Sequence, residues 1–147
     1  MRHPTAGRVD RSRPLTFRFD GVEYTGYVGD TLASALLANG VHHVATSVLH
    51  RRPRGIVSAG SEEPSAVVQI EEPFPEPMVT ATTVELYDGL VASRIAGRGR
   101  LADRPDPARY DAVHAHCEVL VVGGGPAGLA AAASRPDGRV VLLDERP

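Results

Sequence analysis

The feature that most constrains the fold is a glycine-rich segment that follows an apolar run near the end of the chain. Residues 117–147 read CEVLVVGGGPAGLAAAASRPDGRVVLLDERP. Residues 118–122 are typical of a parallel strand that is buried on both faces, and residues 139–143 repeat this pattern. Between them, the glycines fit G-x-G-x-x-G and lead into helix-forming residues. The segment therefore predicts a strand, a glycine turn, a helix and a second strand.

Each position of this turn has a physical task in binding a dinucleotide. Gly123 allows the chain to turn sharply, Gly125 allows the backbone to approach a pyrophosphate, and Gly128 allows the helix to pack closely on the strand. Pro126 suits the first helical position, and Ala127 lies in the same first turn, whose N–H groups and positive dipole end would face phosphate. We predict that these residues bind the diphosphate of NAD or FAD, which the glycines do not distinguish.

An acidic residue closes the second strand about 20 residues past the glycines, where such folds bind the ribose. Asp144 is the first residue past the strand and is the favoured ribose ligand, with Glu145 as the alternative. A carboxylate there accepts hydrogen bonds from both ribose hydroxyls. The competing interpretation of the whole segment is a glycine turn without a ligand.

Composition excludes several classes of function. All 16 basic residues are arginine, so a Schiff-base lysine and a Walker A loop are excluded. The formal net charge of −2 gives no reason to expect nucleic acid or an anionic membrane as a partner. The single cysteine excludes an internal disulfide and fits a reducing compartment. Because no apolar stretch approaches the roughly 20 residues that span a bilayer, we expect no membrane segment and a cytoplasmic protein.

The remaining chain predicts an α+β fold in several parts. Residues 1–14 have no periodicity and are expected to be a disordered tail. Residues 15–90 predict a small sheet with one helix, which resembles a β-grasp (ferredoxin-like) domain. Its hairpin turns at Asp20-Gly21, and its helix follows an N-cap at Thr31 and ends at Asn39-Gly40. Residues 91–116 look like a linker, and residues 117–147 form an incomplete Rossmann βαβ unit.

The other polar clusters indicate no catalytic residue and no metal site. The six histidines and Cys117 lack regular ligand spacing, and Cys117 abuts a strand predicted to be buried, where a thiol is usually inert. The arginines at 51, 52 and 54 fit a solvated loop, with an anion or a partner's carboxylates as the alternative. The glutamates that lie among prolines fit exposed loop charge: Glu62, Glu63, Glu71, Glu72 and Glu76.

Several stretches resemble the amino-terminal region of the heterotetrameric sarcosine oxidase alpha subunit family. These stretches are Gly29-Asp30-Thr31-Leu32, Arg52-Pro53-Arg54-Gly55-Ile56, Ser58-Ala59-Gly60, Glu62-Glu63-Pro64, Ala81-Thr82-Thr83, Leu86-Tyr87-Asp88-Gly89-Leu90, Arg109-Tyr110-Asp111 and His116 to Leu120. The resemblance covers most of residues 15–147. It implies a role in flavin-dependent amine oxidation, with a ferredoxin-like domain before a dinucleotide-binding domain and with other subunits of a heteromeric oxidase as partners.

Two expectations depart from that family. Related amino-terminal domains can hold a [2Fe–2S] cluster, which needs four thiolates, and a chain with only Cys117 is expected to hold none. The family chain is also longer, so the resemblance suggests a fragment, a split subunit or an inactive remnant. A noncatalytic assembly module is a further alternative.

In a two-stranded βαβ unit one sheet face would meet water, at Val119, Val121, Val141 and Leu143. Because such a unit would be only marginally ordered alone, we expect weak or undetectable NAD binding.

Overall fold

The chain forms two compact units in the computed structural model, which describes residues 2–135 and 137–144. Unit 1 comprises residues 1–106, and unit 2 comprises residues 107–147. Unit 1 contains a sheet, one α-helix and the short 3-10 helix η1 (Gly60–Glu62), whereas unit 2 contains two strands and one helix. The fold is mixed α+β, as the sequence predicts, and it contains little helix.

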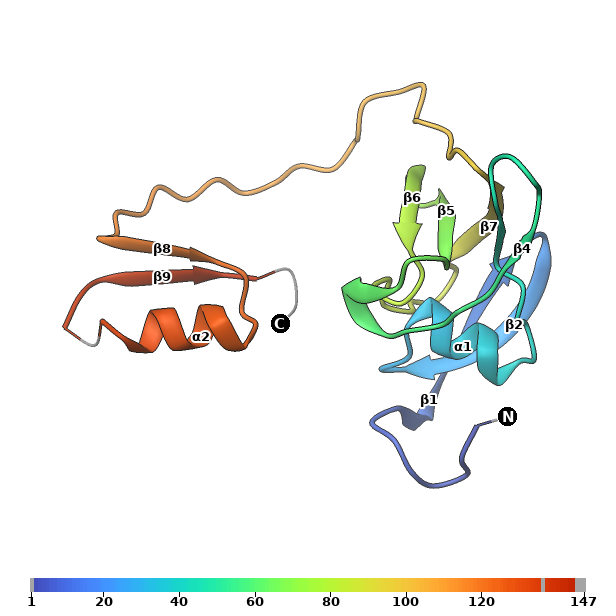
Figure 1. Ribbon diagram of the computed structural model, residues 1–147, viewed down its shortest axis with the longest axis horizontal. Coiled ribbons are helices and arrows are strands. Elements are labelled where there is room, and N and C mark those ends of the chain that lie inside the picture. Colours follow the sequence, from blue (N-terminus) through green and yellow to red (C-terminus); the bar gives the residue numbers. More distant parts are fainter. Residues whose placement is uncertain (1, 136, 145–147) are drawn as a thin grey trace. The chain divides into compact units, whose positions relative to one another are not determined.

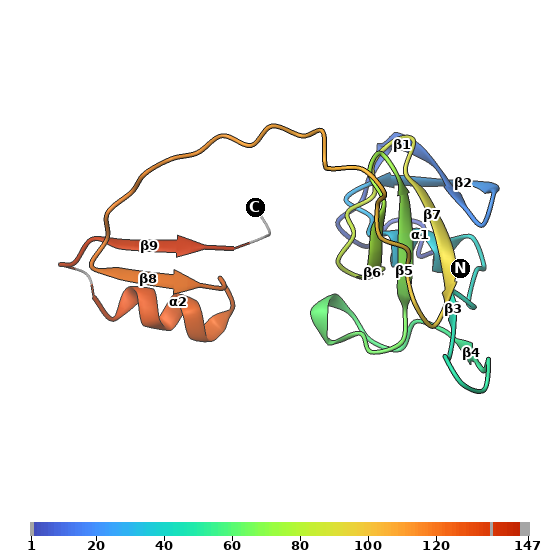
Figure 2. The ribbon, with the colours of Figure 1, turned by 90° about the horizontal axis from the view of Figure 1, so that it is seen from above.

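Strand β7 (Val91–Ala96) lies at the centre of the seven-stranded sheet of unit 1. On one side it pairs in parallel with β1 (Asp10–Phe19) at its start and with β3 (Ala45–Thr46) at its end. On the other side it pairs antiparallel with β5 (Val67–Glu72). Each of these three strands has an antiparallel outer neighbour: β2 (Val22–Val28), β4 (Pro53–Arg54) and β6 (Glu76–Thr80), respectively. The sheet is strongly curled (Figures 1 and 2).

Helix α1 (Leu32–Ala38) covers the inner face of this sheet (Figure 1). It begins with a capping box, in which the Thr31 hydroxyl accepts from the Ser34 N–H and the Ser34 hydroxyl accepts from the Thr31 N–H. Leu32 and Leu36 are fully buried against Phe17 and Phe19 in the core. Burying each leucine contributes about 1.5–3 kcal/mol, so packing, more than the short helix itself, stabilises this element.

The hairpin between β1 and β2 turns where the sequence predicts it. Asp20 and Gly21 both have positive φ, at 51° and 79°, as the tight type I′ turn requires. The helix end is also as predicted, because Gly40, with φ of 78°, supplies the left-handed residue after the Asn39 C-cap.

The ends of unit 1 differ from the expected boundaries. Strand β1 starts at Asp10, within the segment expected to be a disordered tail. Residues 91–96, expected to belong to a linker, form the central strand β7. Arginine and glycine gave this stretch the composition of a linker, but Leu90, Ala92 and Ile95 are buried, which makes it part of the core.

Unit 2 is a β-α-β arrangement. Strands β8 (Val119–Val122) and β9 (Val140–Leu143) pair in parallel, and α2 (Pro126–Ala133) lies along one face of the pair (Figures 1 and 2). The opposite face is apolar and open, since Leu120 is 56% and Val122 is 78% exposed. The expectation that Val119 and Val121 would be on the open face was wrong, because both are partly buried on the alternate side of the strand. Val141 is also partly buried, whereas Leu143 is 52% exposed, as expected.

Candidate functional site

The glycine turn joins β8 to α2 as the sequence predicts. Gly123 has a φ of 103°, which a residue with a side chain rarely adopts, and its N–H donates to the Leu143 carbonyl at 2.8 Å. Gly125 is the N-cap of α2, and Pro126 occupies the first helical turn. Ala127 and Gly128 follow in that turn, where backbone N–H groups have no partner within the helix. This geometry can accept an anion.

Gly128 is required by close packing. A Cβ atom at this position would lie 1.9 Å from the Gly123 carbonyl oxygen, which no side chain can tolerate. A Cβ at Gly125, by contrast, would meet nothing within 4 Å. The two glycines therefore have different tasks: Gly128 allows the helix to approach the turn, and Gly125 leaves the space in front of the helix open.

Asp144 lies directly beside the glycine turn. Its Oδ2 accepts a hydrogen bond from the Gly124 N–H at 2.5 Å, so the structure brings the predicted acidic residue and the predicted glycines together. Val122, Gly123, Leu143 and Asp144 line an open hollow of about 390 Å³ at the carboxyl ends of β8 and β9. Glu145, the alternative ribose ligand, lies outside the described residues.

Glu63 in unit 1 is a site that the sequence interpretation missed. This glutamate was expected to be exposed loop charge, but it is only 4% exposed. One carboxylate oxygen accepts from the Val57 and Ser58 N–H groups, and the other accepts from those of Ser65 and Ala66, at 2.6–3.0 Å. The carboxylate therefore holds the loop around η1 in shape. Burial raises the pKa of Glu63, but the four N–H donors outweigh burial, so its pKa lies below the ordinary value.

The described histidines and Cys117 do not come together as a metal site. Among the described residues, no group of three or more His, Cys, Asp or Glu side chains is arranged to hold a metal ion. His43 interacts instead with Arg94, at 3.1 Å between Nδ1 and Nη1. Cys117 is exposed, which corrects the expectation that it would be inert through burial beside a strand.

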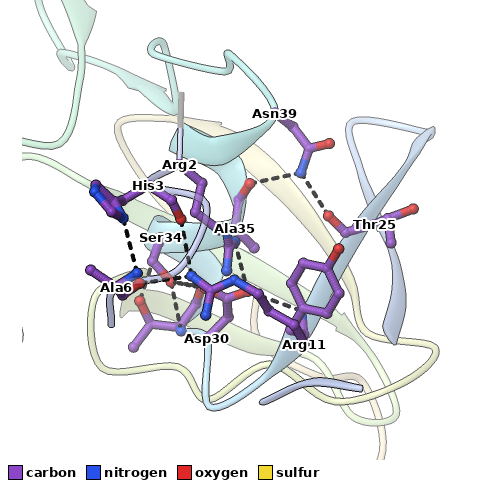
Figure 3. Close-up of polar contacts among 11 residues, drawn as sticks. Arg2, His3, Ala6, Arg11, Thr25, Asp30, Ser34, Ala35 and Asn39 are labelled. Carbon is purple, nitrogen blue, oxygen red and sulfur yellow. Dashed lines mark hydrogen bonds and ion pairs between the residues drawn. The ribbon is translucent and has the colours of Figure 1, made fainter. Parts of the chain in front are cut away.

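A second site lies in unit 1 beneath the start of the chain. The Asp30 carboxylate is 1% exposed and accepts from the Ser34 hydroxyl at 2.6 Å and from the Tyr27 N–H at 2.9 Å. The guanidinium of Arg2 completes its environment at 2.7 Å (Figure 3). This pair could not be predicted from the sequence, because the two residues are far apart in the chain and residues 1–14 were expected to be disordered.

Comparison with known proteins identifies the family of unit 1. Residues 12–97 match the model of the 2Fe-2S iron-sulfur cluster binding domain. The chain belongs to this family.

No helix in the described ranges is long and apolar enough to cross a membrane.

The resemblance to the sarcosine oxidase alpha subunit family is confirmed. The chain is 51% identical to sarcosine oxidase subunit alpha of Corynebacterium sp. (strain U-96), over 97% of this chain and 16% of that protein. It is 38% identical to sarcosine oxidase subunit alpha of Rhizobium meliloti (strain 1021), over 98% of this chain and 20% of that protein. The chain thus corresponds to the amino-terminal part of these relatives and spans at most a fifth of their length.

A solved structure of a second oxidoreductase is also similar. L-proline dehydrogenase from P. horikoshii is 25% identical, with a TM-score of 0.57, over 90% of this chain and 25% of that one.

The family match corrects the expectation that the chain holds no iron–sulfur cluster, because the matched family is one that binds a 2Fe–2S cluster. The residues of the matched range do not supply the usual ligands of such a cluster. A 2Fe–2S centre is held by four cysteine thiolates, or by two cysteines and two histidines, and residues 12–97 contain no cysteine. Cys117 lies beyond the matched range.

Proposed function

We propose that unit 2 binds the diphosphate of a dinucleotide and contributes this site to a flavin-dependent amine oxidoreductase of the sarcosine oxidase type. The observation that carries the proposal is the junction of β8 and α2, where the glycine turn and the Asp144 carboxylate lie side by side. In this proposal residues 117–147 are the start of a Rossmann domain and residues 15–90 are a β-grasp domain. The relatives named sarcosine oxidase subunit alpha support the reaction class.

The proposed contacts follow from the chemistry of each group. Gly123 and Gly125 let the main chain approach the diphosphate, and the first turn of α2, through Pro126, Ala127 and Gly128, directs its positive dipole end at the charge. Asp144 would accept hydrogen bonds from the ribose hydroxyls, and a carboxylate there would repel a 2′-phosphate. The dinucleotide supplies the redox chemistry when it is bound. Both NAD and FAD contain the part that these residues would meet.

Gly125→Ala provides the sharpest test. A Cβ at Gly125 meets no protein atom within 4 Å, so the variant should fold, but the methyl group would occupy the space that the diphosphate needs. We expect weak binding to the wild-type chain, because the hollow is open, and an affinity about tenfold lower in the variant, a loss of about 1.4 kcal/mol. Titration with NAD⁺ and, separately, FAD can be followed through the amide NMR signals of residues 123–128 and 144.

A matched control is Ser134→Ala, at the other end of α2, where the hydroxyl bonds only the Ala131 carbonyl among its described partners. This variant should bind like the wild type. Saturable binding that is equal in wild type and Gly125→Ala would contradict the proposal, as would the absence of any shift in residues 123–128 with either dinucleotide.

A second candidate function is assembly, in which unit 1 docks on another subunit of a heteromeric oxidase. The names of the relatives favour it, since each is called a subunit. Co-expression of the chain with the other subunits of a sarcosine oxidase, followed by size-exclusion chromatography, tests it. A chain that elutes alone in the presence of those subunits would contradict the assembly role.

A further inference from the structure

Asp30 is a charged group in the interior of unit 1. A carboxylate that is 1% exposed must be compensated, because burying an unpaired charge is very costly. Neutral donors supply part of the compensation: the Ser34 hydroxyl donates to Oδ1 and the Tyr27 N–H donates to Oδ2. These donors leave the negative charge itself uncancelled, so the site requires a cation.

The cation comes from outside the sheet. Arg2 precedes β1, and its Nη2 lies 2.7 Å from Asp30 Oδ2. Its guanidinium carbon also lies 5.3 Å from the centroid of the Tyr27 ring, which is the arrangement of a cation–π contact. A buried carboxylate beside an aromatic face recognises a planar organic cation by both charge and shape.

The segment that carries Arg2 lies at the surface, and its main chain at Arg8 and Val9 passes close to Gly29. Residues 3–8 are exposed, and His3 Nδ1 accepts from the neighbouring Thr5 and Ala6 N–H groups. Arg11 holds the segment to β1 by donating to the carbonyls of His3 and Ala6 (Figure 3). Arg2 is therefore a cation carried by an exposed segment, and its ion pair with Asp30 is one of the contacts that hold this segment near the start of α1.

A hollow lies under this segment and has room for a ligand. It measures about 450 Å³, within the range of small-molecule sites. Its polar lining consists of Asp30, Thr31 and Ser34, together with the side chains of Arg2 and Arg11. Val9, Leu37 and Ala38 supply an apolar wall. An alkyl group attached to a cation at Asp30 would have apolar surface to contact.

We propose that Asp30, Ser34 and Tyr27 form a binding site for an alkylguanidinium group, which Arg2 of the same chain occupies. Arg2 acts as a tethered ligand of this site. A free alkylguanidinium takes its place when residues 2–9 move aside. The site is separate from the glycine turn and does not depend on dinucleotide binding.

The test replaces the tethered group by a free one. Arg2→Ala removes the side chain beyond Cβ, and ethylguanidinium contains the atoms that are lost. We expect the variant to bind ethylguanidinium with a Kd of about 1 mM, as suits so small a ligand, with saturable shifts of the Asp30 and Ser34 amide NMR signals. The wild type should bind at least about tenfold more weakly, because Arg2 competes at a high effective concentration.

Controls separate recognition from a general salt effect. Arg8→Ala removes an exposed arginine from the same segment and should behave like the wild type. Arg2→Ala/Asp30→Asn should show no saturable shift. If that double variant does not fold, Arg2→Ala/Tyr27→Leu serves instead, with binding about threefold weaker through loss of the aromatic face. The proposal is overturned if Arg2→Ala shows no saturable shift up to about 20 mM ligand, or if the second substitution leaves the affinity unchanged.

Discussion

Glu63 shows how a single carboxylate can fix a loop. Its two oxygens receive four backbone N–H groups from both sides of η1, and the Thr82 hydroxyl donates to the Gly60 carbonyl in the same loop. Because the donors favour the charged form, the pKa of Glu63 is below its ordinary value of 4.5 in the folded chain. The stability that this difference contributes is present above pH 4.5 and is lost as the pH falls through the lower, folded-state pKa.

We therefore predict that Glu63→Gln destabilises unit 1 by about 2 kcal/mol near pH 7, since the amide leaves buried N–H donors without acceptors. The difference from the wild type should shrink as the pH falls below 4.5, because the Glu63 carboxyl of the unfolded chain is protonated first and that of the folded chain only at a lower pH. Urea unfolding followed by circular dichroism at pH 7 and pH 3.5 measures both effects. Glu62→Gln, at an exposed neighbour, is the control and should match the wild type. A difference that grows on acidification would contradict this account.

At the scale of elements, local signals were predictable and long-range ones were not. The turn at Asp20-Gly21, the cap at Thr31 and the glycine turn each depend on a few adjacent residues, and each forms where the sequence predicts it. The strand β7 could not be recognised in the same way, because its place is set by pairing with β1, β3 and β5. The burial of Glu63 likewise depends on donors that the fold brings together.

The face of β8 that meets α2 is also set by packing and not by the local sequence. The apolar run predicts a strand buried on both faces and leaves the direction of each side chain open. The position of Gly128 decides it, since a Cβ there would lie 3.3 Å from the Val121 side chain, so Val121 faces the helix. Leu120 and Val122 therefore point away from it.

Helix α2 depends on Gly128 for its place against β8. We predict that Gly128→Ala disrupts unit 2 at a cost of about 1–3 kcal/mol, because the methyl group would collide with the Gly123 carbonyl and the main chain must shift. Gly125→Ala is the matched control, with an open position for its methyl group. Loss of the dispersed amide NMR signals of residues 119–122 in the first variant alone is the expected result. Dispersed signals that survive Gly128→Ala would contradict the close approach of helix and turn.

At the scale of the whole molecule, buried residues are unevenly distributed. Unit 1 has a continuous core, and five of its residues are each at most 1% exposed: Phe17, Phe19, Leu36, Val68 and Leu90. In unit 2, no described residue is buried. Hydrophobic burial supplies most of the favourable free energy of folding, so the resistance to local opening should follow this distribution.

We predict that backbone hydrogen exchange separates the two units. The amides of β7 at the centre of the large sheet should be the most protected, because opening them exposes the core. Among the described strands, β8 and β9 pair only with each other, and they lie beside solvent-exposed leucine and valine, so the protection of their amides should be lower by about 2 kcal/mol or more. Exchange measured by NMR on the full chain gives both values in one experiment. Equal protection in β7 and β8 would contradict this prediction, because it would mean that unit 2 has burial that β8, α2 and β9 do not supply. Adding NAD⁺ or FAD to the same sample extends the test. A dinucleotide site at the glycine turn requires that the protection of residues 119–128 rise with the ligand.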